Sequence, residues 1–161
     1  MIKDSGNRTE FASGAVRDIQ EGKGRCDLLP LDVVARFAFP MSSVAFKMIG
    51  EFQDSGNADR LVCVLEWFAD SFFGETYTMI LEVAKHFEEG AKKYGERNWQ
   101  KGIPVCRYID SAVRHLVKFL RGDDDEPHDR AFCWNIMCAI WTCQHLPHLN
   151  DYAVMGGVAD D

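Results

Sequence analysis

The stretch VCRYIDSAVRHLVKFL, residues 105–120, decides the fold that the sequence predicts. Its apolar side chains recur every three or four positions, which is the period of one face of an α-helix. They are Val105, Tyr108, Ile109, Ala112, Val113, Leu116, Val117 and Leu120. Gly122 suits the end of this helix, because glycine adopts the left-handed conformation without steric cost. The segment therefore predicts an amphipathic helix that lies against a core.

Further helices are predicted on both sides of this segment. Apolar residues follow a helical period from Thr76 to Tyr94, and Gly95 suits the C-terminal cap of that helix. The segment from Pro127 to Gln144 is apolar nearly all round, which is typical of a helix buried on most sides. We therefore expect a mostly α-helical fold.

The N-terminal part of the sequence is less regular. Residues 1–30 are polar and dotted with glycines, and they predict an arm with a short helix over residues 15–21. A helical pattern over residues 31–50 is interrupted by a proline. We expect one compact helical domain over residues 1–150, followed by a loose C-terminal tail at 151–161.

Composition and charge narrow the class of protein. The chain has 161 residues, and its eleven Phe, four Trp and four Tyr exclude extensive disorder. A net charge of −7 disfavours long nucleic acids as partners, although a local basic pocket can still bind a small phosphate ligand. No run of 18 apolar residues occurs and the chain starts without a signal-peptide core, so we expect a cytoplasmic protein that binds no membrane.

Charged and imidazole side chains form candidate sites on all three helices. Four of them share one face of the helix at 76–94: Glu82, His86, Glu89 and Lys93. That face is either solvated or covered by a second layer, where it would hold a divalent metal or position a water molecule. The helix at 105–120 carries Asp110, Arg114 and Lys118 on one flank and His115 on the other. Its cations suit phosphate oxygens, or they form an ordinary basic surface near a helix C-terminus.

The remaining candidates lie on the last helix and on two loops. His128 and Asn135 share a stripe of small residues on this helix. Their polar groups are either satisfied by hydrogen bonds to other helices or face a ligand. The arm supplies Arg17, Lys23 and Arg25 close to glycines. The loop at 95–104, with the preceding tyrosine, supplies Tyr94, Arg97, Asn98 and Trp99. An arginine, an amide and an indole suit a base and its phosphates, although a Trp that anchors a loop to the core is at least as common.

Three stretches together resemble a known family. They are FASGAVRDIQEGKGRCDLLP (11–30), KHFEEGAKKYGERNWQKGIP (85–104) and RYIDSAVRHLVKFLRGDDDEPHDRAFCWNIMCAI (107–140). They are similar to the phage-borne family of dATP/dGTP diphosphohydrolase N-terminal domains, which is associated with all-α pyrophosphohydrolases of the MazG kind. The resemblance implies cleavage of dNTPs between the α- and β-phosphates, with Mg²⁺ held by an ExxE and an ExxD pair.

The sequence departs from that pattern in two places. No clean ExxE occurs in the helix at 76–94, and His128 and Asn135 stand where the ExxD pair is expected. Residues 38–80 look inserted between LDVVARF and LEVAKHF, which are continuous in the family. This insert would build a lid, an oligomer contact or a pocket wall.

The first functional hypothesis is a metal-dependent dNTP pyrophosphohydrolase that acts on dATP or dGTP. In this hypothesis Glu89 and Asp110 hold Mg²⁺ or Mn²⁺, Glu89 thereby takes part in catalysis, and His115 or His128 orients water or acts as a base. The other cationic and loop residues named above bind the nucleotide and its phosphates.

Two further hypotheses remain open. A phage protein of this kind would act as a non-catalytic binder that sequesters cyclic or other nucleotide immune signals, because the acidic quartet is incomplete. Alternatively, the polar residues serve only the fold of a structural or partner-binding domain. We expect a homo-oligomer, because the charged face of the helix at 76–94 needs a facing layer.

Overall fold

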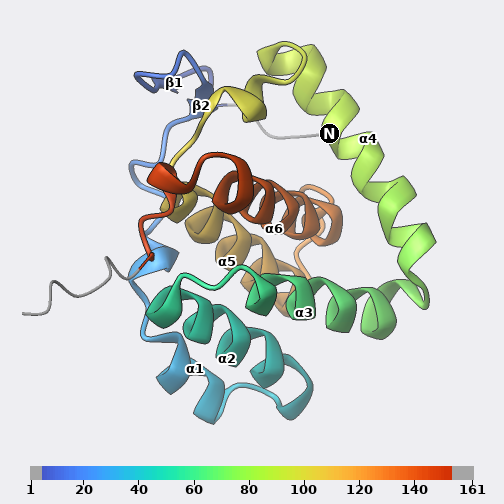
Figure 1. Cartoon of the computed structure of the whole chain (residues 1–161). Helices are drawn as coiled ribbons and strands as arrows, with labels where there is room; N and C mark the ends of the chain where they lie inside the picture. Colours follow the sequence, from blue (N-terminus) through green and yellow to red (C-terminus); the bar gives the residue numbers. More distant parts are fainter. Residues whose placement is uncertain (1–4, 154–161) are drawn as a thin grey trace, which may run out of the picture.

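Helix α5 (Val105–Arg121) lies at the centre of the fold, and α6 (His128–His145) packs along it (Figure 1). The structure is a computed structural model that describes residues 5–153. Six of the eight residues in the predicted apolar stripe of α5 are buried, whereas Val117 and Leu120 are 41% and 40% exposed. The helix ends where Gly122 takes a φ of 85°. The prediction of this helix and of a mostly α fold is confirmed.

The two neighbouring helices also form where the sequence predicts them. Helix α4 (Thr76–Tyr94) crosses α6 and ends as the N–H of Gly95 donates to the carbonyl of Ala91 (Figure 1). Helix α6 starts directly after Pro127, and ten of its eighteen residues are buried. Its apolar character on all sides thus matches its place between the other helices.

A second group of helices covers the far side of α5 and α6. It consists of α1 (Leu31–Phe37), α2 (Pro40–Ser55), α3 (Asp59–Phe68) and a π-helical turn, η2 (Ala69–Phe73). Pro40 occupies the first turn of α2, where its missing N–H leaves no helical hydrogen bond unmade. The segment at 38–80 therefore folds mainly as α2, α3 and η2. Helix α3 packs on α2, on η2 and on α6.

The N-terminal arm forms a β-hairpin, so the prediction of a short helix at 15–21 was wrong. Strands β1 (Arg8–Glu10) and β2 (Val16–Asp18) pair in antiparallel register, with Arg8 opposite Asp18. The side chain of Asn98 accepts a hydrogen bond from the Val16 N–H at 2.9 Å and donates to the Val16 carbonyl at 2.7 Å. These bonds occupy the backbone groups that a helix would use internally.

Short segments complete the described chain. Three 3-10 turns join the helices: η1 (Cys26–Leu28), η3 (Asn98–Lys101) and η4 (Pro147–Leu149). The first part of the expected loose tail is packed, because Asp151 accepts a hydrogen bond from the Cys106 N–H and Tyr152 contacts the ring of Phe52. The rest of that tail, residues 154–161, lies outside the described residues. Within residues 5–153 no helix combines the length and the apolar character needed to cross a membrane.

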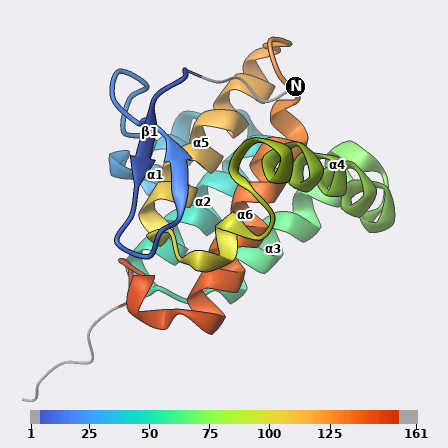
Figure 2. The ribbon, with the colours of Figure 1, turned by 90° about the horizontal axis from the view of Figure 1, so that it is seen from above.

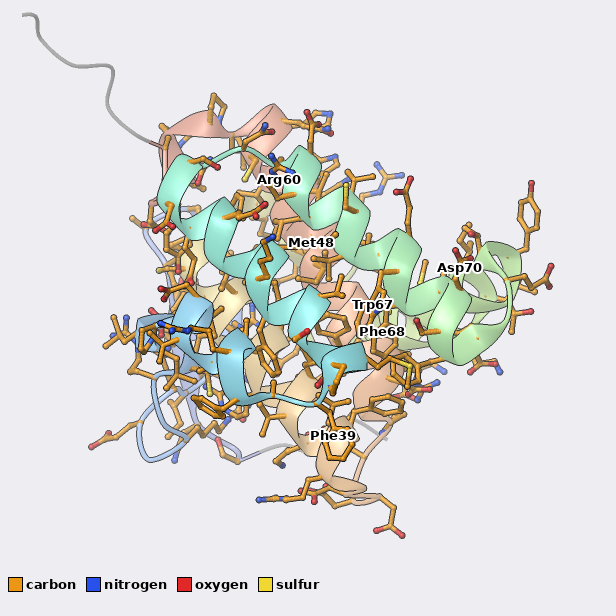
Figure 3. The ribbon with its side chains drawn as sticks, turned by 90° about the horizontal axis from the view of Figure 1, so that it is seen from below. Phe39, Met48, Arg60, Trp67, Phe68 and Asp70 are labelled. Carbon is orange, nitrogen blue, oxygen red and sulfur yellow. The ribbon has the colours of Figure 1, made fainter. Side chains whose placement is uncertain are left out.

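An aromatic cluster around Phe68 joins the two groups of helices. The Phe68 ring is fully buried, and its centroid lies 4.8 Å from that of Phe132 on α6 and 5.4 Å from that of Phe119 on α5. Figure 3 shows Phe68 on α3 and Phe39 at the start of α2. Phe39 is 85% exposed, so the two phenylalanines differ sharply in their environment.

Replacing Phe68 by alanine should destabilise the protein by about 3–5 kcal/mol, because it removes a buried ring and leaves a cavity between the helix groups. Phe39→Ala is the matched control and should change the free energy of unfolding by less than about 0.5 kcal/mol. Urea denaturation followed by circular dichroism measures both. Equal losses in the two variants would contradict the packing described here.

Candidate functional site

A cavity of about 660 Å³ lies between the arm, the C-terminal half of α4, the following turn, α5 and α6. Its volume falls in the range of small-molecule sites. Figure 2 shows the hairpin and the segment after α4 on the same side of α5 and α6. Six cationic side chains line the cavity: Arg17, Lys23, Arg97, Arg107, Arg114 and Lys118. Five carboxylates also line it, so cations outnumber acids by one at the cavity, whereas the whole chain has a net charge of −7.

The buried carboxylate of Asp110 fixes the arm to α5. Asp110 is 2% exposed, and its Oδ2 accepts hydrogen bonds from Gln20 Nε2 at 2.6 Å and from Arg114 Nη2 at 2.5 Å. Its Oδ1 accepts the N–H of Cys26 at 2.7 Å. We call these four residues the Asp110 anchor. Both oxygens of this carboxylate are thus engaged in holding two parts of the arm.

Arg114 strengthens the same attachment. Its Nε donates to the carbonyl of Lys23 at 3.0 Å, and its Nη2 donates to that of Gly24 at 2.9 Å. Arg114 therefore makes two hydrogen bonds to the arm and one to Asp110. The sequence suggested Arg114 as a phosphate ligand, and the structure gives it a positioning role at the cavity wall.

Arg17 is a cation at the wall of the cavity, and its guanidinium is buried. Its guanidinium lies over the rings of Tyr108 and Trp134, 4.9 Å and 5.8 Å from their centroids, and its Nη2 donates to Asn135 Oδ1. Asn135 is itself held by its Nδ2, which donates to the carbonyl of Ala131. The Nη1 of Arg17 is buried and has no hydrogen-bond partner among the described residues.

Burial lowers the pKa of Arg17 from its ordinary value, and the nearby Tyr108 acts in the opposite direction. The guanidinium nevertheless keeps its charge at neutral pH, because arginine titrates far above it. A buried, charged N–H group without an acceptor is costly unless an anion completes it. The arrangement of Arg17 and Asn135 therefore suits an anionic ligand inside the cavity.

Two histidines and two carboxylates meet at the end of the cavity near the start of α6. The Nδ1 atoms of His115 and His128 are 2.9 Å apart, and Glu126 Oε1 lies 3.8 Å and 3.7 Å from them. The Nε2 of His128 is 2.7 Å from Asp125 Oδ1. Burial, together with the neighbouring His128, lowers the pKa of His115 well below its usual range, so this imidazole is neutral.

The structure places several predicted residues beside these groups. Most of the sequence's candidates line the cavity: Arg17, Lys23, Tyr94, Arg97, Asn98, Trp99, Asp110, Arg114, His115, Lys118 and Asn135. Asn98 is engaged by the backbone of β2, and the Trp99 ring packs on Trp141 with centroids 5.0 Å apart. These two residues therefore anchor the loop as well as lining the cavity.

Five predicted residues do not line the cavity. Glu82 pairs with Lys85 on the same helix. Arg25 pairs with Asp27, and the Nζ of Lys93 lies over the ring of Tyr94. Glu89 accepts a hydrogen bond from Arg130 Nη2 at 2.6 Å. His128 is buried behind His115.

The proposed metal pair of Glu89 and Asp110 does not fit a shared magnesium ion. Asp110 uses both oxygens in the Asp110 anchor, and Glu89 pairs with Arg130. Among residues 5–153, two groups of three potential metal ligands occur. They are His115, Glu126 and His128, and Asp123, Asp125 and His128. Neither group contains Glu89 or Asp110.

Sequence reasoning missed Glu126, Arg107 and Gln20 as residues of this region. Glu126 belongs to an acidic run that suits a helix start, and this ordinary role concealed its position beside His115. Gln20 reaches Asp110 across 90 residues of sequence, a separation that no local pattern reveals.

The fold and the cavity define a mostly α-helical domain with a site that is lined by several cations and is large enough for a nucleotide. The model of the family described as dATP/dGTP diphosphohydrolase, N-terminal, matches residues 76–152. This match confirms the resemblance found over 85–104 and 107–140, whereas the arm segment at 11–30 lies outside it. No curated protein and no solved structure shows significant similarity to the chain.

His86 on α4 provides a pH-dependent test of the packing at the cavity wall. It lies against Trp134, and burial, together with Arg130, lowers the pKa of His86 to about 4. Because its pKa is about 6.5 in the unfolded chain, the unfolded state binds the proton more strongly. The contribution of the neutral His86 imidazole to the free energy of unfolding is complete above pH 6.5 and is lost as the pH falls toward 4.

The free energy of unfolding of the wild type should therefore decrease as the pH falls from 6.5 to 4, and His86 should account for up to about 3 kcal/mol of this decrease. In His86→Gln the decrease should be smaller by that amount. His148→Gln, at an exposed position, should keep the wild-type pH dependence. Urea titrations between pH 7 and pH 4 give the comparison. An unchanged pH dependence in His86→Gln would show that His86 is not held neutral in the folded protein.

Proposed function

We propose that the cavity binds the phosphates of a purine deoxynucleoside triphosphate and that the protein hydrolyses dATP or dGTP to the monophosphate and pyrophosphate. The single observation that carries the proposal is Arg17 at the wall of a cavity of nucleotide size, where its buried Nη1 has no hydrogen-bond acceptor among residues 5–153. The family match supplies the substrate class.

The charges around the cavity support phosphate binding. Two of its five carboxylates are compensated by cations, since Asp18 pairs with Lys23 and Asp110 pairs with Arg114. The repulsion of an incoming phosphate is thereby reduced, and the Nη1 of Arg17 has no acceptor among the described residues. In this proposal Arg17 and Lys118 contact phosphate oxygens, while Arg114 keeps the arm in place.

Aromatic side chains provide the apolar part of the site. Trp134, Phe87 and Trp99 line the cavity and pack on one another, with ring centroids 5.4–5.8 Å apart for the contacts of Phe87. A purine base can stack on such a wall or lie along its edge, whereas the phosphates extend toward the cations.

The base for hydrolysis would come from the histidine cluster. His115 is neutral and touches His128, which is oriented in turn by Asp125. A neutral imidazole supported by a second histidine and a carboxylate would take the proton of a water that attacks the α-phosphorus as pyrophosphate leaves, and Asp125 would stabilise the charged histidine pair without taking the proton. We derive no step through magnesium, because Glu89 and Asp110 do not fit it.

Analysis of the reaction products distinguishes hydrolysis from binding without cleavage. Incubation with dATP or dGTP and Mn²⁺, followed by chromatography, should show the monophosphate and pyrophosphate. Nucleotide that binds tightly and is recovered intact after heat denaturation of the protein would favour sequestration. A phage origin, a cytoplasmic location and a homo-oligomer stay predictions.

Replacing Arg17 by methionine should weaken the binding of dATP by roughly 10- to 100-fold, the range expected for a lost hydrogen bond to a charged group. Calorimetry without divalent metal measures this step apart from cleavage. Arg36→Met, an exposed position on α1, is the matched control and should bind like the wild type. Equal affinity of the Arg17 variant and the wild type would remove Arg17 from the site and contradict the proposal.

A further inference from the structure

We propose that His115, Glu126 and His128 form a binding site for one divalent first-row transition-metal ion at the wall of the cavity. This inference deepens the proposed function, since the ion would lie beside the phosphates, and it replaces the carboxylate pair expected from the sequence. The three ligand atoms come from α5, from the turn before α6 and from the first residue of α6.

The donor atoms converge on one point. The two Nδ1 atoms are 2.9 Å apart and each is within 3.8 Å of Glu126 Oε1. Metal–nitrogen bonds of about 2.1 Å place two nitrogens about 3.0 Å apart when they are at right angles, but about 3.4 Å apart in a tetrahedron. The separation of 2.9 Å is that of a hydrogen bond between the two rings, and only a small shift would let both nitrogens bind one ion instead.

A carboxylate beside His128 can orient this histidine as a metal ligand. Its Nε2 lies 2.7 Å from Asp125 Oδ1, so the ring proton belongs on Nε2 and the lone pair of Nδ1 is directed at His115. A carboxylate that accepts the outer N–H of a ligating histidine is the usual support of such a ligand. Lys118 Nζ lies 3.5 Å from Asp125 and further fixes that carboxylate.

The ligand set also indicates the class of metal. Two imidazoles and one carboxylate suit Mn²⁺, Fe²⁺ or Co²⁺, whereas Mg²⁺ prefers oxygen ligands alone. His115 and Glu126 line the cavity, so the ion's remaining positions would face the space assigned to the phosphates. The second candidate group shares His128 and takes its other two ligands, Asp123 and Asp125, from the turn before α6, and neither of these lines the cavity.

The test uses the full chain and the metal alone. Titration with Mn²⁺, followed by the loss of the electron paramagnetic resonance signal of free Mn²⁺, should show one bound ion per chain. Glu126→Gln and His115→Gln should each weaken this binding by more than tenfold, and Asp125→Asn by about ten- to a hundredfold. Glu96→Gln, which changes another carboxylate at the cavity, should bind Mn²⁺ like the wild type.

A thermal melt gives a second readout that does not depend on activity. Mn²⁺ should raise the melting temperature of the wild type and of Glu96→Gln, but not that of Glu126→Gln. Absence of Mn²⁺ binding in the wild type, or unchanged binding in both Glu126→Gln and His115→Gln, would overturn the inference. Because no nucleotide is present, metal binding with no dATP binding would reject the proposed function alone, and the reverse result would reject the metal site alone.

Discussion

The attachment of the arm to α5 through the buried carboxylate of Asp110 is the constraint on which the site depends. A hairpin with three-residue strands is marginal by itself, so its position must come from contacts with the helices. Asp110 receives hydrogen bonds from Gln20 and Cys26, and Arg114 compensates its charge. A buried carboxylate in this state is costly to disrupt, because removal of one partner leaves polar groups without water.

The Asp110 anchor explains how an acidic protein gathers several cations around one cavity. The arm brings Arg17 and Lys23 over α5 and α6, and Asn98 fixes β2 from the opposite side. The family match begins at α4, so these cations come from a part of the chain outside it. The cavity is therefore formed by the helices that the family model matches together with an arm that lies outside the match.

The sequence predicts the helices well because their information is local. The bounds of α4 and the buried stripe of α5 follow from a period of 3.6 residues and from terminal glycines. The hairpin was not predictable in this way, because its strands are held by Asn98, about eighty residues away.

In the candidate site, too, the sequence predicts the types of residue but not the contacts between distant ones. Residue types gave the cations and the histidines, and the structure confirms that most of them line one cavity. Spacing alone did not reveal that Asp110 is a structural acceptor or that Glu126 faces His115, because both facts depend on partners from other elements. An acidic residue one turn from an arginine suits a metal site and a buried ion pair equally well until its partners are known.

Hydrogen exchange of the arm in Asp110→Asn tests the central claim most directly. We expect the amides of Val16–Asp18 and Cys26 to lose protection in this variant, while those of α5 and α6 away from the substitution remain protected. An arm that exchanges as slowly in Asp110→Asn as in the wild type would contradict the claim that this carboxylate holds the site together.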